Sequence, residues 1–349
     1  MTRALARSAG AIALESRAPT SGVVLADSQL TLPGLQPVEW VWCEDTEEAT
    51  VAFEHATVMK AEVVGALAPR AGTFVDVTLG GGGHAEAILE ASEDARVIGF
   101  DRDPSALEAS RARLARFEGR VTFVHSAFGA IAEKLAELGV GAVQGLCADL
   151  GVSSPQLDDP TRGMSFRHEG PLDMRMDSSA GETALDLVAR LSESELADVI
   201  YQWGDERRSR RIARHVKRAL EAGELHTTLD LRRAIVRAVG PVRIGGVDPA
   251  TRTFQALRIA VNDELGEVAR LLAALPDVIA PGGVAAIISF HSLEDRLVKH
   301  AFQDKGAWAP LTKKPLVAAD DEVATNARSR SAKLRAARRL PKAIDGGAP

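Results

Sequence analysis

A run of four glycines between an apolar segment and a helical one places the strongest constraint on how this chain can fold. The run Gly80–Gly83 follows the short apolar segment Thr73–Thr78 and precedes the helical segment Ala85–Ala91. Four glycines in succession are costly unless the backbone must adopt positive φ or let a ligand approach closely. A strand, a glycine turn and a helix bring backbone N–H groups and a helix N-terminus against a bound nucleotide. We therefore predict an adenosine-type ligand at this turn.

The sequence around this turn alternates between short apolar runs and amphipathic runs. The apolar runs predict strands over Thr73–Thr78, Arg96–Phe100, Val121–His125, Gly145–Asp149 and, after the turn Pro281–Gly283, Val284–Phe290. The amphipathic runs predict helices over Met59–Leu67, Ala85–Ala91, Ser105–Phe117 and Ile131–Leu138. Alternation of strands and helices at this spacing indicates a Rossmann-like α/β domain, in which helices cover both faces of a parallel sheet.

The fourth and fifth predicted strands are too far apart for an ordinary crossover. Asp149 and Val284 are 135 residues apart, whereas a crossover with its loops needs about a dozen to a few dozen residues. Residues 191–239 predict two or three amphipathic helices, with Ser192 and Glu195 as a capping box at the first helix start. We therefore predict an inserted helical domain. Its bounds are residues 165–249, and the Rossmann-like domain comprises residues 51–164 and 250–342.

The two ends of the chain show no sustained hydrophobic period. Residues 1–50 are rich in Ala, Ser, Thr and Pro, and we interpret them as a disordered extension, with Trp40 and Trp42 as candidate docking side chains. Residues 343–349 are interpreted as a flexible tail. No apolar run reaches the roughly 20 residues that a membrane span needs, and the N-terminus lacks a secretion signal. We therefore expect a cytoplasmic protein without a membrane partner.

Cysteine content and net charge exclude several classes of protein. The chain has two cysteines, Cys43 and Cys147, and a formal net charge of −6. Two distant cysteines make neither a disulfide framework nor a four-ligand zinc site, so we expect a reducing compartment and no bound metal. The acidic balance argues against a protein that coats nucleic acid nonspecifically, although it allows local basic patches.

A carboxylate stands where a nucleotide ribose would lie. Asp101 ends the second predicted strand, seventeen residues after His84, at the place for an acid that accepts hydrogen bonds from two ribose hydroxyls. The pattern Gly80-x-Gly82-x-x-Ala85 also fits the dinucleotide fingerprint, so the glycines do not separate NAD from S-adenosylmethionine. The polar segment Asp149–Ser154 at the fourth strand end, the Pro-Gly-Gly turn and the lack of a second nucleotide-binding half favour S-adenosylmethionine.

Several blocks of the sequence stand in an order and spacing typical of one family. They are His55–Met59, Asp76–His84, Phe100–Pro104, Asp149–Asp158, Gly170–Met176, Thr253–Ile259 and Ser289–Arg296. In these blocks the chain resembles the bacterial 16S rRNA cytosine-N4 methyltransferases of the MraW type, over residues 55–340. Gly81 departs from the family, which often has a larger residue there, and residues 1–50 have no counterpart.

The resemblance implies a fold, a reaction and a set of cofactor contacts. The implied fold is a class I methyltransferase domain with a doubly wound, mostly parallel seven-stranded sheet. The implied reaction moves a methyl group from S-adenosyl-L-methionine to N4 of a P-site cytidine in 16S rRNA, within the small ribosomal subunit. The implied cofactor contacts are Gly82, Gly83, His84, Asp101, Phe128, Asp149 and Gln156. On sequence alone, Phe128 fits a core aromatic almost as well.

The chemistry of the acceptor indicates which side chains to consider as catalytic. The exocyclic amine of cytosine is a poor nucleophile, and an acceptor aligned with one N–H would help to localise the lone pair and receive the proton. Asp149, Ser154 and His291 are the candidates, with Ser153 beside them. Asp149 is also consistent with a structural or cofactor-facing carboxylate. Methylation at carbon 5 of the base needs a cysteine nucleophile at the acceptor site, which the positions of Cys43 and Cys147 disfavour.

Two basic clusters suggest contact with RNA phosphates. Residues 207–218 and 328–342 each hold seven Lys or Arg residues and no acid. The predicted RNA contacts are Arg207, Arg208, Arg210, Arg211 and Arg214 in the first cluster, and Arg328, Arg330, Lys333 and Arg335 in the second. Tyr201 and Trp203 are candidate stacking residues near the first cluster. A solvated helix face and a charged tail are the alternatives.

Two other functions stay open at this point. One is an NAD-dependent oxidoreductase, because the glycine pattern fits that cofactor as well. The other is a noncatalytic RNA-binding ribosome assembly factor that keeps the fold. The oligomeric state is open too, with a homodimer as one alternative.

Overall fold

The computed structural model describes residues 57–242 and 247–341. The predicted extension over residues 1–50, with Trp40, Trp42 and Cys43, lies outside the described residues, and so does the predicted tail over 343–349. Across the two described ranges, no helix is both long and apolar enough to cross a membrane.

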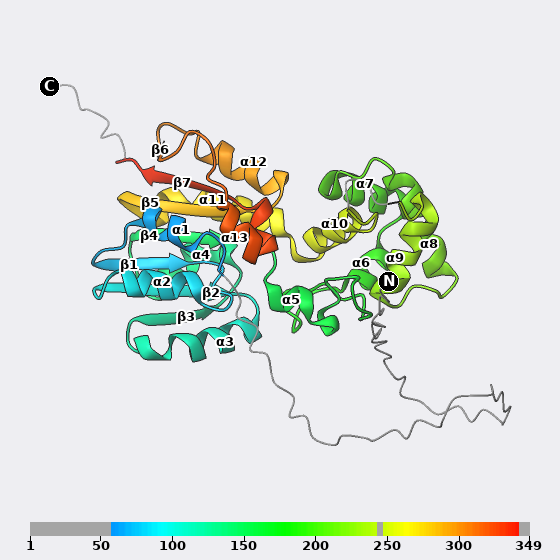
Figure 1. Cartoon of the computed structure of the whole chain (residues 1–349), viewed down its shortest axis with the longest axis horizontal. Coiled ribbons are helices and arrows are strands. Elements are labelled where there is room, and N and C mark those ends of the chain that lie inside the picture. The colour runs from blue at the N-terminus through cyan, green and yellow to red at the C-terminus, as the bar shows by residue number, and fades with distance from the viewer. Residues whose placement is uncertain (1–56, 243–246, 342–349) are drawn as a thin grey trace, which may run out of the picture. The chain divides into compact units, whose positions relative to one another are not determined.

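The described residues form one seven-stranded sheet (Figure 1), in the order β3-β2-β1-β4-β5-β7-β6. The strands are β1 (Gly72–Asp76), β2 (Ala95–Asp101), β3 (Val121–His125), β4 (Val143–Asp149), β5 (Ile279–Ser289), β6 (Trp308–Pro310) and β7 (Lys333–Arg339). Strands β1 to β5 run parallel, and β7 pairs antiparallel with β5 and β6. The doubly wound, mostly parallel seven-stranded sheet is confirmed. Its order reverses between β1 and β4, which places a crevice at the carboxyl ends of these strands.

The helices alternate with the strands as predicted. In chain order they are α1 (Lys60–Leu67), α2 (Gly83–Ala91), α3 (Pro104–Leu114), α4 (Ile131–Glu137), α5 (Ser154–Asp158), α6 (Ala184–Arg190), α7 (Glu193–Gly204), α8 (Ser209–Glu221), α9 (Thr228–Val239), α10 (Thr251–Asn262), α11 (Glu264–Val278), α12 (Ser292–Ala301) and α13 (Asp320–Thr325). Four short 3-10 helices accompany them, namely η1 (Ala115–Phe117), η2 (Phe128–Ala130), η3 (Pro160–Arg162) and η4 (Ala327–Ser331).

Two hydrophobic clusters cover the two faces of the sheet. Val75 and Ile98 belong to one cluster, and their chain neighbours Phe74 and Val97 belong to the other. Because successive strand residues point to opposite faces, the two clusters lie on opposite sides of the sheet. Helices α4, α11 and α12 contribute to the first cluster, and α1, α2 and α3 to the second. This packing fixes the strand ends that carry the polar residues described below.

Helices α6 to α9 follow β4 and precede β5 in the chain, where the helical insertion is predicted (Figure 1). The capping box at the start of α7 is confirmed, since Ser192 Oγ accepts the N–H of Glu195 at 3.2 Å and Glu195 accepts the N–H of Ser192 at 2.8 Å. A third hydrophobic cluster joins these helices to Phe254 and Leu257 of α10. The domain bounds at 165 and 249 stay a prediction.

The predicted turn before the fifth strand lies inside that strand. Strand β5 begins at Ile279, and Pro281–Gly283 form an irregularity where the register of β4 shifts between Val143 and Gly145. The prediction of a turn there is therefore wrong. A proline without an N–H and a glycine at φ +85° mark a bulge in this strand instead of its start.

The second basic cluster is not a charged tail, and this alternative is wrong. Strand β7 lies between β5 and β6, with Leu334 and Ala337 fully buried. Arg339 is also buried, because its guanidinium donates to the carbonyls of Pro276 at 2.9 Å and Ala307 at 3.2 Å. The many charged residues hide the apolar pattern by which a strand is predicted. The segment is nevertheless a strand, because its arginines find hydrogen-bond partners inside the protein. Lys342 lies outside the described residues.

Candidate active site

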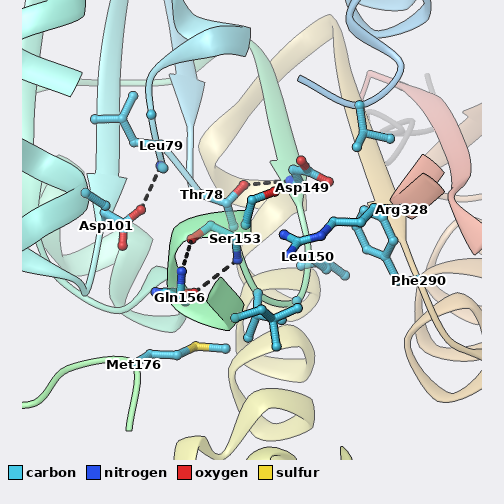
Figure 2. A pocket seen from close by; sticks show the side chains of 18 of the residues that line it. Thr78, Leu79, Asp101, Asp149, Leu150, Ser153, Gln156, Met176, Phe290 and Arg328 are labelled. Carbon is cyan, nitrogen blue, oxygen red and sulfur yellow. Dashed lines mark hydrogen bonds between the residues drawn. The ribbon is translucent and has the colours of Figure 1, made fainter. Parts of the chain in front are cut away.

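A cavity of about 340 Å³ opens at the carboxyl ends of β1, β2, β4 and β5 (Figure 2). Its lining includes Thr78, Gly80, Gly81, Gly83, His84, Asp101, Phe128, Asp149, Ser153, Ser154, Gln156, Gln255, Arg258, Phe290, His291, Asn326, Arg328 and Ser331. The cavity therefore brings together every predicted cofactor and catalytic residue except Gly82. This is the crevice expected where the strand order reverses.

The glycine turn is built by two left-handed residues. Gly80 has φ +50° and Gly82 has φ +79°, while the N–H of Gly82 donates to the carbonyl of Leu79 at 2.7 Å. Gly82 does not line the cavity, so its place in the predicted cofactor set rests on the shape it gives to the turn. Gly83 leaves no room for a side chain, since a Cβ there would lie 1.7 Å from Thr57 Oγ1.

Replacing Gly82 with alanine is expected to destabilise the turn, and replacing Gly81 is not. A side chain at Gly82 meets a positive φ and a 3.3 Å contact with Leu114, whereas a Cβ at Gly81 would have nothing within 4 Å. A left-handed alanine costs about 1–2 kcal/mol. Gly82→Ala should therefore lower the unfolding midpoint and the affinity for S-adenosylmethionine, measured by thermal denaturation and calorimetry. Equal effects of Gly82→Ala and Gly81→Ala would contradict this account.

Asp101 lies at the end of β2 with both oxygens engaged by backbone N–H groups. Oδ2 accepts the N–H of Gly80 at 2.8 Å and Oδ1 accepts the N–H of Asp103 at 2.8 Å. Burial raises the pKa of Asp101, and these two N–H groups oppose that rise. A carboxylate oxygen has more than one lone pair, so Asp101 can hold the glycine turn and still accept hydrogen bonds from a ligand in the cavity.

His84 and Gln156 both line the cavity, and each also holds a neighbouring segment in place through hydrogen bonds. His84 is buried and its Nε2 lies 2.9 Å from the carbonyl oxygen of Val58, which fixes the segment before α1. Gln156 donates to Asp103 Oδ2 at 2.8 Å and accepts the N–H of Ser153 at 3.1 Å, as part of the capping box of α5. Phe128 begins η2, lines the cavity and packs against the first core cluster. Its packing fits a core aromatic, and its contact with the cofactor stays a prediction.

Asp149 is a buried carboxylate that lines the cavity and lacks a full set of partners. Its backbone N–H donates to Thr78 Oγ1 at 2.6 Å, while its Oδ1 is buried and has no hydrogen-bond partner among the described residues. Burial raises the pKa of Asp149 well above its usual range, and the charges of Asp76, Glu294 and Glu322 add to that rise. Asp76 ends the adjacent strand β1, and burial is the main cause that raises its pKa to about 7. An orphaned acceptor in a buried cavity is costly, and a ligand that donates to it would remove that cost.

His291 is held at the end of β5 by Glu294. Nε2 of His291 lies 3.0 Å from Oε1 of Glu294, whose Oε2 accepts the N–H of Phe290 at 2.9 Å. Burial would raise the pKa of Glu294, but His291 and the Phe290 amide hold this pKa below its usual range. Because Glu294 already holds the His291 ring, this arrangement suits a positioning role better than that of a base. Ser154, the third catalytic candidate, begins α5 at the cavity wall.

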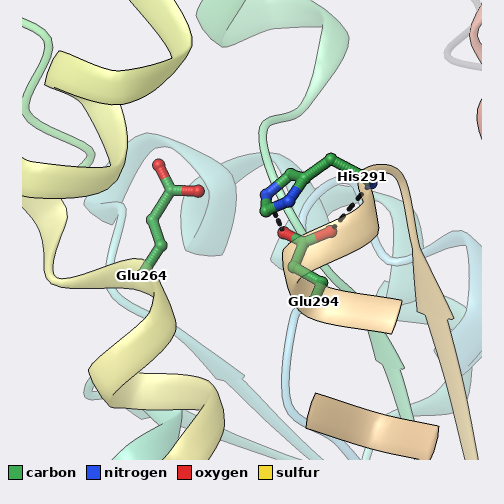
Figure 3. A group of neighbouring side chains, drawn as sticks. All are labelled: Glu264, His291 and Glu294. Atoms are coloured by element: carbon green, nitrogen blue, oxygen red, sulfur yellow. Dashed lines mark hydrogen bonds and ion pairs between the residues drawn. The ribbon is translucent and has the colours of Figure 1, made fainter. Parts of the chain in front are cut away.

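Glu264, His291 and Glu294 form a group with metal-ligand chemistry (Figure 3), since each offers a ligand atom and these atoms lie within 4.8 Å of one another. Arg258 already balances the charge of this group. Its Nε and Nη2 donate to the two carboxylate oxygens of Glu264 at 2.7 and 2.8 Å. The group is thus two adjoining ion pairs, Arg258 with Glu264 and His291 with Glu294. The expectation of no metal stays a prediction.

The cavity also contains residues that the sequence analysis did not assign to it. Thr78 supports Asp149, and Asn326, Arg328 and Ser331 reach the cavity from η4, near the C-terminal end of the described chain. Thr78 stands in a block that the family resemblance identifies, so that block marks it without giving its role. In the sequence, Arg328 stands in a basic cluster, and this pattern predicted a surface contact with RNA instead of a place in the cavity.

The first basic cluster, residues 207–218, lies on α8 and just before it, and only some of its cations are free of ion pairs. Arg210 pairs with Asp198 at 2.8 Å, Arg214 with Glu193 at 3.3 Å and Arg208 with Glu206 at 3.2 Å. The exposed Arg207, Arg211 and Arg218 have no ion pair within the described ranges. In the second cluster, Lys333 and Arg335 share Asp295, at 3.7 and 2.7 Å, and Arg330 is exposed.

Comparison with known proteins gives one family. Residues 52–340 match the model of the MraW methylase family. A protein named Ribosomal RNA small subunit methyltransferase H from Sorangium cellulosum is 66% identical over 288 residues, which cover 82% of this chain and 91% of that protein. The protein of the same name from Synechococcus elongatus is 50% identical over 291 residues, covering 83% and 96% of the two chains. A solved rRNA methylase from Streptococcus thermophilus has 10% identity over 81% of this chain and 94% of that one, with a TM-score of 0.38.

Proposed function

Because the chain belongs to the MraW methylase family, we propose that it methylates N4 of a P-site cytidine in 16S rRNA. The chain is an S-adenosylmethionine-dependent methyltransferase, and its relatives carry the name of a small-subunit rRNA methyltransferase. This family excludes the NAD-dependent oxidoreductase. The observation that carries the proposal is one cavity lined by Asp101 at the end of β2 and Asp149 at the end of β4, on either side of β1, with Asp149 Oδ1 buried and without a partner among the described residues. We also propose that the protein acts in the cytoplasm, where small ribosomal subunits are assembled.

The residues of the cavity fit the methyl donor. The amides and close backbone of the Gly80–Gly83 turn suit an adenosine, and Asp101 suits the two ribose hydroxyls. Phe128 and Gln156 line the same cavity, on the segments that follow β3 and β4. S-adenosylmethionine supplies an electrophilic methyl group on a cationic sulfonium, so transfer is an in-line displacement that depends on positioning.

Asp149 is the residue that suits the acceptor amine. Its buried Oδ1 lacks a partner among the described residues, and an N–H of the cytosine amine can supply one. Accepting that hydrogen bond helps to localise the nitrogen lone pair, and the carboxylate can then receive the proton as the new bond forms. Ser153, Ser154 and His291 position the surrounding loops. This role for Asp149 combines the two alternatives that its sequence position left open.

Helix α8 supplies the surface proposed to hold the rRNA. The free cations, Arg207 just before α8 and Arg211 and Arg218 on it, are the ones expected to contact phosphates, because Arg210 and Arg214 are already ion-paired. Tyr201 on α7 is exposed and can stack on an unpaired base. The paired Arg208 is a less suitable phosphate contact.

Neutralising the free cations of the first basic cluster is expected to flatten the salt dependence of RNA binding. Removing one cation that touches a phosphate lowers the slope of log K against log salt by about 0.7–0.9. The triple variant Arg207→Gln, Arg211→Gln and Arg218→Gln should therefore lower the slope by about 2. The matched control replaces the paired Arg210 and Arg214 with glutamine. An equal slope in the triple variant and the wild type, from filter binding at several salt concentrations, would reduce α8 to a solvated face.

A direct assay tests the proposed function. Small subunits from cells that lack the protein are incubated with the purified protein and S-adenosylmethionine carrying a tritiated methyl group. The rRNA is then digested and its nucleosides are separated by mass spectrometry. Label in N4-methylcytidine at one position supports the proposal. Label in another nucleoside overturns the acceptor, and tight cofactor binding without label in the rRNA favours the noncatalytic assembly factor.

A further inference from the structure

One arginine in the cavity has donors that the protein does not use. Arg328 belongs to η4 and lines the cavity, and its Nη1 is buried without a hydrogen-bond partner in the described part of the chain. Its Nη2 lies 3.6 Å from Asp158 Oδ2, which is too long for a hydrogen bond. A buried cationic donor without an acceptor costs more than a neutral one. The position of Arg328 therefore calls for a ligand that accepts hydrogen bonds.

The other cavity arginines are more nearly satisfied. Both carboxylate oxygens of Glu264 accept hydrogen bonds from Arg258. Arg102 donates through Nη1 to the Asn262 carbonyl at 2.9 Å, although its Nε is also buried without a partner among the described residues. In the view of Figure 2, Ser153 lies between Asp101 and Arg328, and the side chain of Arg328 extends to a place beside Asp149. Since Asp101 suits the ribose of the methyl donor, Arg328 lies on the side left for the acceptor.

We propose that Arg328 recognises the Watson–Crick edge of the acceptor cytosine by donating to its O2 and N3 atoms. The proposal rests on the proposed function and names a residue that determines its specificity. Cytosine presents O2 and N3 as adjacent acceptors, and the planar guanidinium presents donors in a matching fork. Uracil carries a hydrogen on N3 and cannot accept there. The same edge of cytosine bears the N4 amine beside N3, so this pairing turns the amine toward Asp149.

The surroundings of Arg328 favour a base over a phosphate. The carboxylate of Asp158 would repel a phosphate at this place, whereas it leaves a neutral carbonyl or ring nitrogen unaffected. Burial lowers the pKa of Arg328, while Asp158 opposes that effect, and a neutral acceptor suits such a half-buried cation. Phe290 lines the same cavity and provides the apolar, aromatic surface on which an unstacked base is held.

A chemical double-mutant cycle tests this assignment. Small subunits are reconstituted with 16S rRNA carrying either cytidine or 3-deazacytidine at the methylated position. The deaza analogue replaces the N3 acceptor with a C–H group. Wild-type protein is expected to lose roughly 5- to 100-fold in kcat/KM on the deaza substrate, because a buried donor loses its partner. The loss of Arg328→Ala on the same change should be smaller than the wild-type loss by about 5-fold or more, since that donor is already absent. Any intrinsic change in amine reactivity is common to both proteins and cancels.

Two controls separate this proposal from neighbouring ones. Arg330→Ala, in the same short helix but exposed, should show the wild-type penalty, and the affinity of Arg328→Ala for S-adenosylmethionine should match that of the wild type. An equal deaza penalty in the wild type and in Arg328→Ala overturns the assignment and leaves a phosphate contact. If the wild type forms no N4-methylcytidine on the cytidine substrate, the proposed function itself fails.

Discussion

Asp149→Asn is expected to lower the rate of methyl transfer by about 10²- to 10⁴-fold, the usual contribution of a positioned base. Asparagine keeps the size of the side chain and the backbone N–H that donates to Thr78 Oγ1. It keeps one oxygen that accepts a hydrogen bond, but it removes the charge and the basicity needed to receive a proton, at a place where Asp149 Oδ1 has no other partner in the described ranges. Single-turnover assays with saturating S-adenosylmethionine measure the chemical step without the binding steps.

The pH dependence of the rate gives an independent check on Asp149. Burial, followed by the charges of Asp76, Glu294 and Glu322, raises the pKa of Asp149. The ionised form that accepts a proton therefore becomes populated only at a higher pH than for an ordinary carboxylate. The wild-type rate should fall as the pH decreases through this raised pKa, and Asp149→Asn should lack that acid limb. Ser154→Ala serves as a control that retains the limb. A rate for Asp149→Asn within about 3-fold of the wild type would exclude Asp149 as the base.

Alternating apolar and amphipathic runs were enough to predict the parallel half of the sheet. Strand β3 has the predicted bounds, and the capping residues of α7 were read directly from the sequence. Strand β7 escaped this approach because Lys333–Arg339 consists mostly of basic and small residues. Its burial depends on acceptors that other segments supply, such as the Pro276 carbonyl for Arg339. The hydrophobic pattern of one segment does not show which distant groups will accept its hydrogen bonds.

The candidate site was predicted best where its residues follow strand ends in sequence. Asp101 and Asp149 end β2 and β4, so the topology of a parallel sheet alone brings them to one edge. Arg328 and Asn326 reach the cavity from η4, which lies beyond the last parallel strand, and no local pattern indicates that return. In the same way, the sequence shows seven cations in residues 207–218 but does not show which of them acids on α7 already neutralise.

Asp101→Ala is expected to weaken S-adenosylmethionine binding by about 1–3 kcal/mol, the cost of leaving hydroxyl donors without their acceptor. Alanine also removes the acceptor for the Gly80 and Asp103 N–H groups, so part of its effect would come from a loosened turn. Asp101→Asn keeps one acceptor oxygen and distinguishes the two contributions. Calorimetry with S-adenosylhomocysteine and its 2′-deoxy derivative then tests the ribose contact itself. The wild type should prefer the hydroxylated ligand, and Asp101→Asn should show a smaller preference. If both proteins lose the same affinity on removal of the hydroxyl, the ribose lies away from Asp101, and the orientation of the methyl donor toward Asp149 would have to be reassigned.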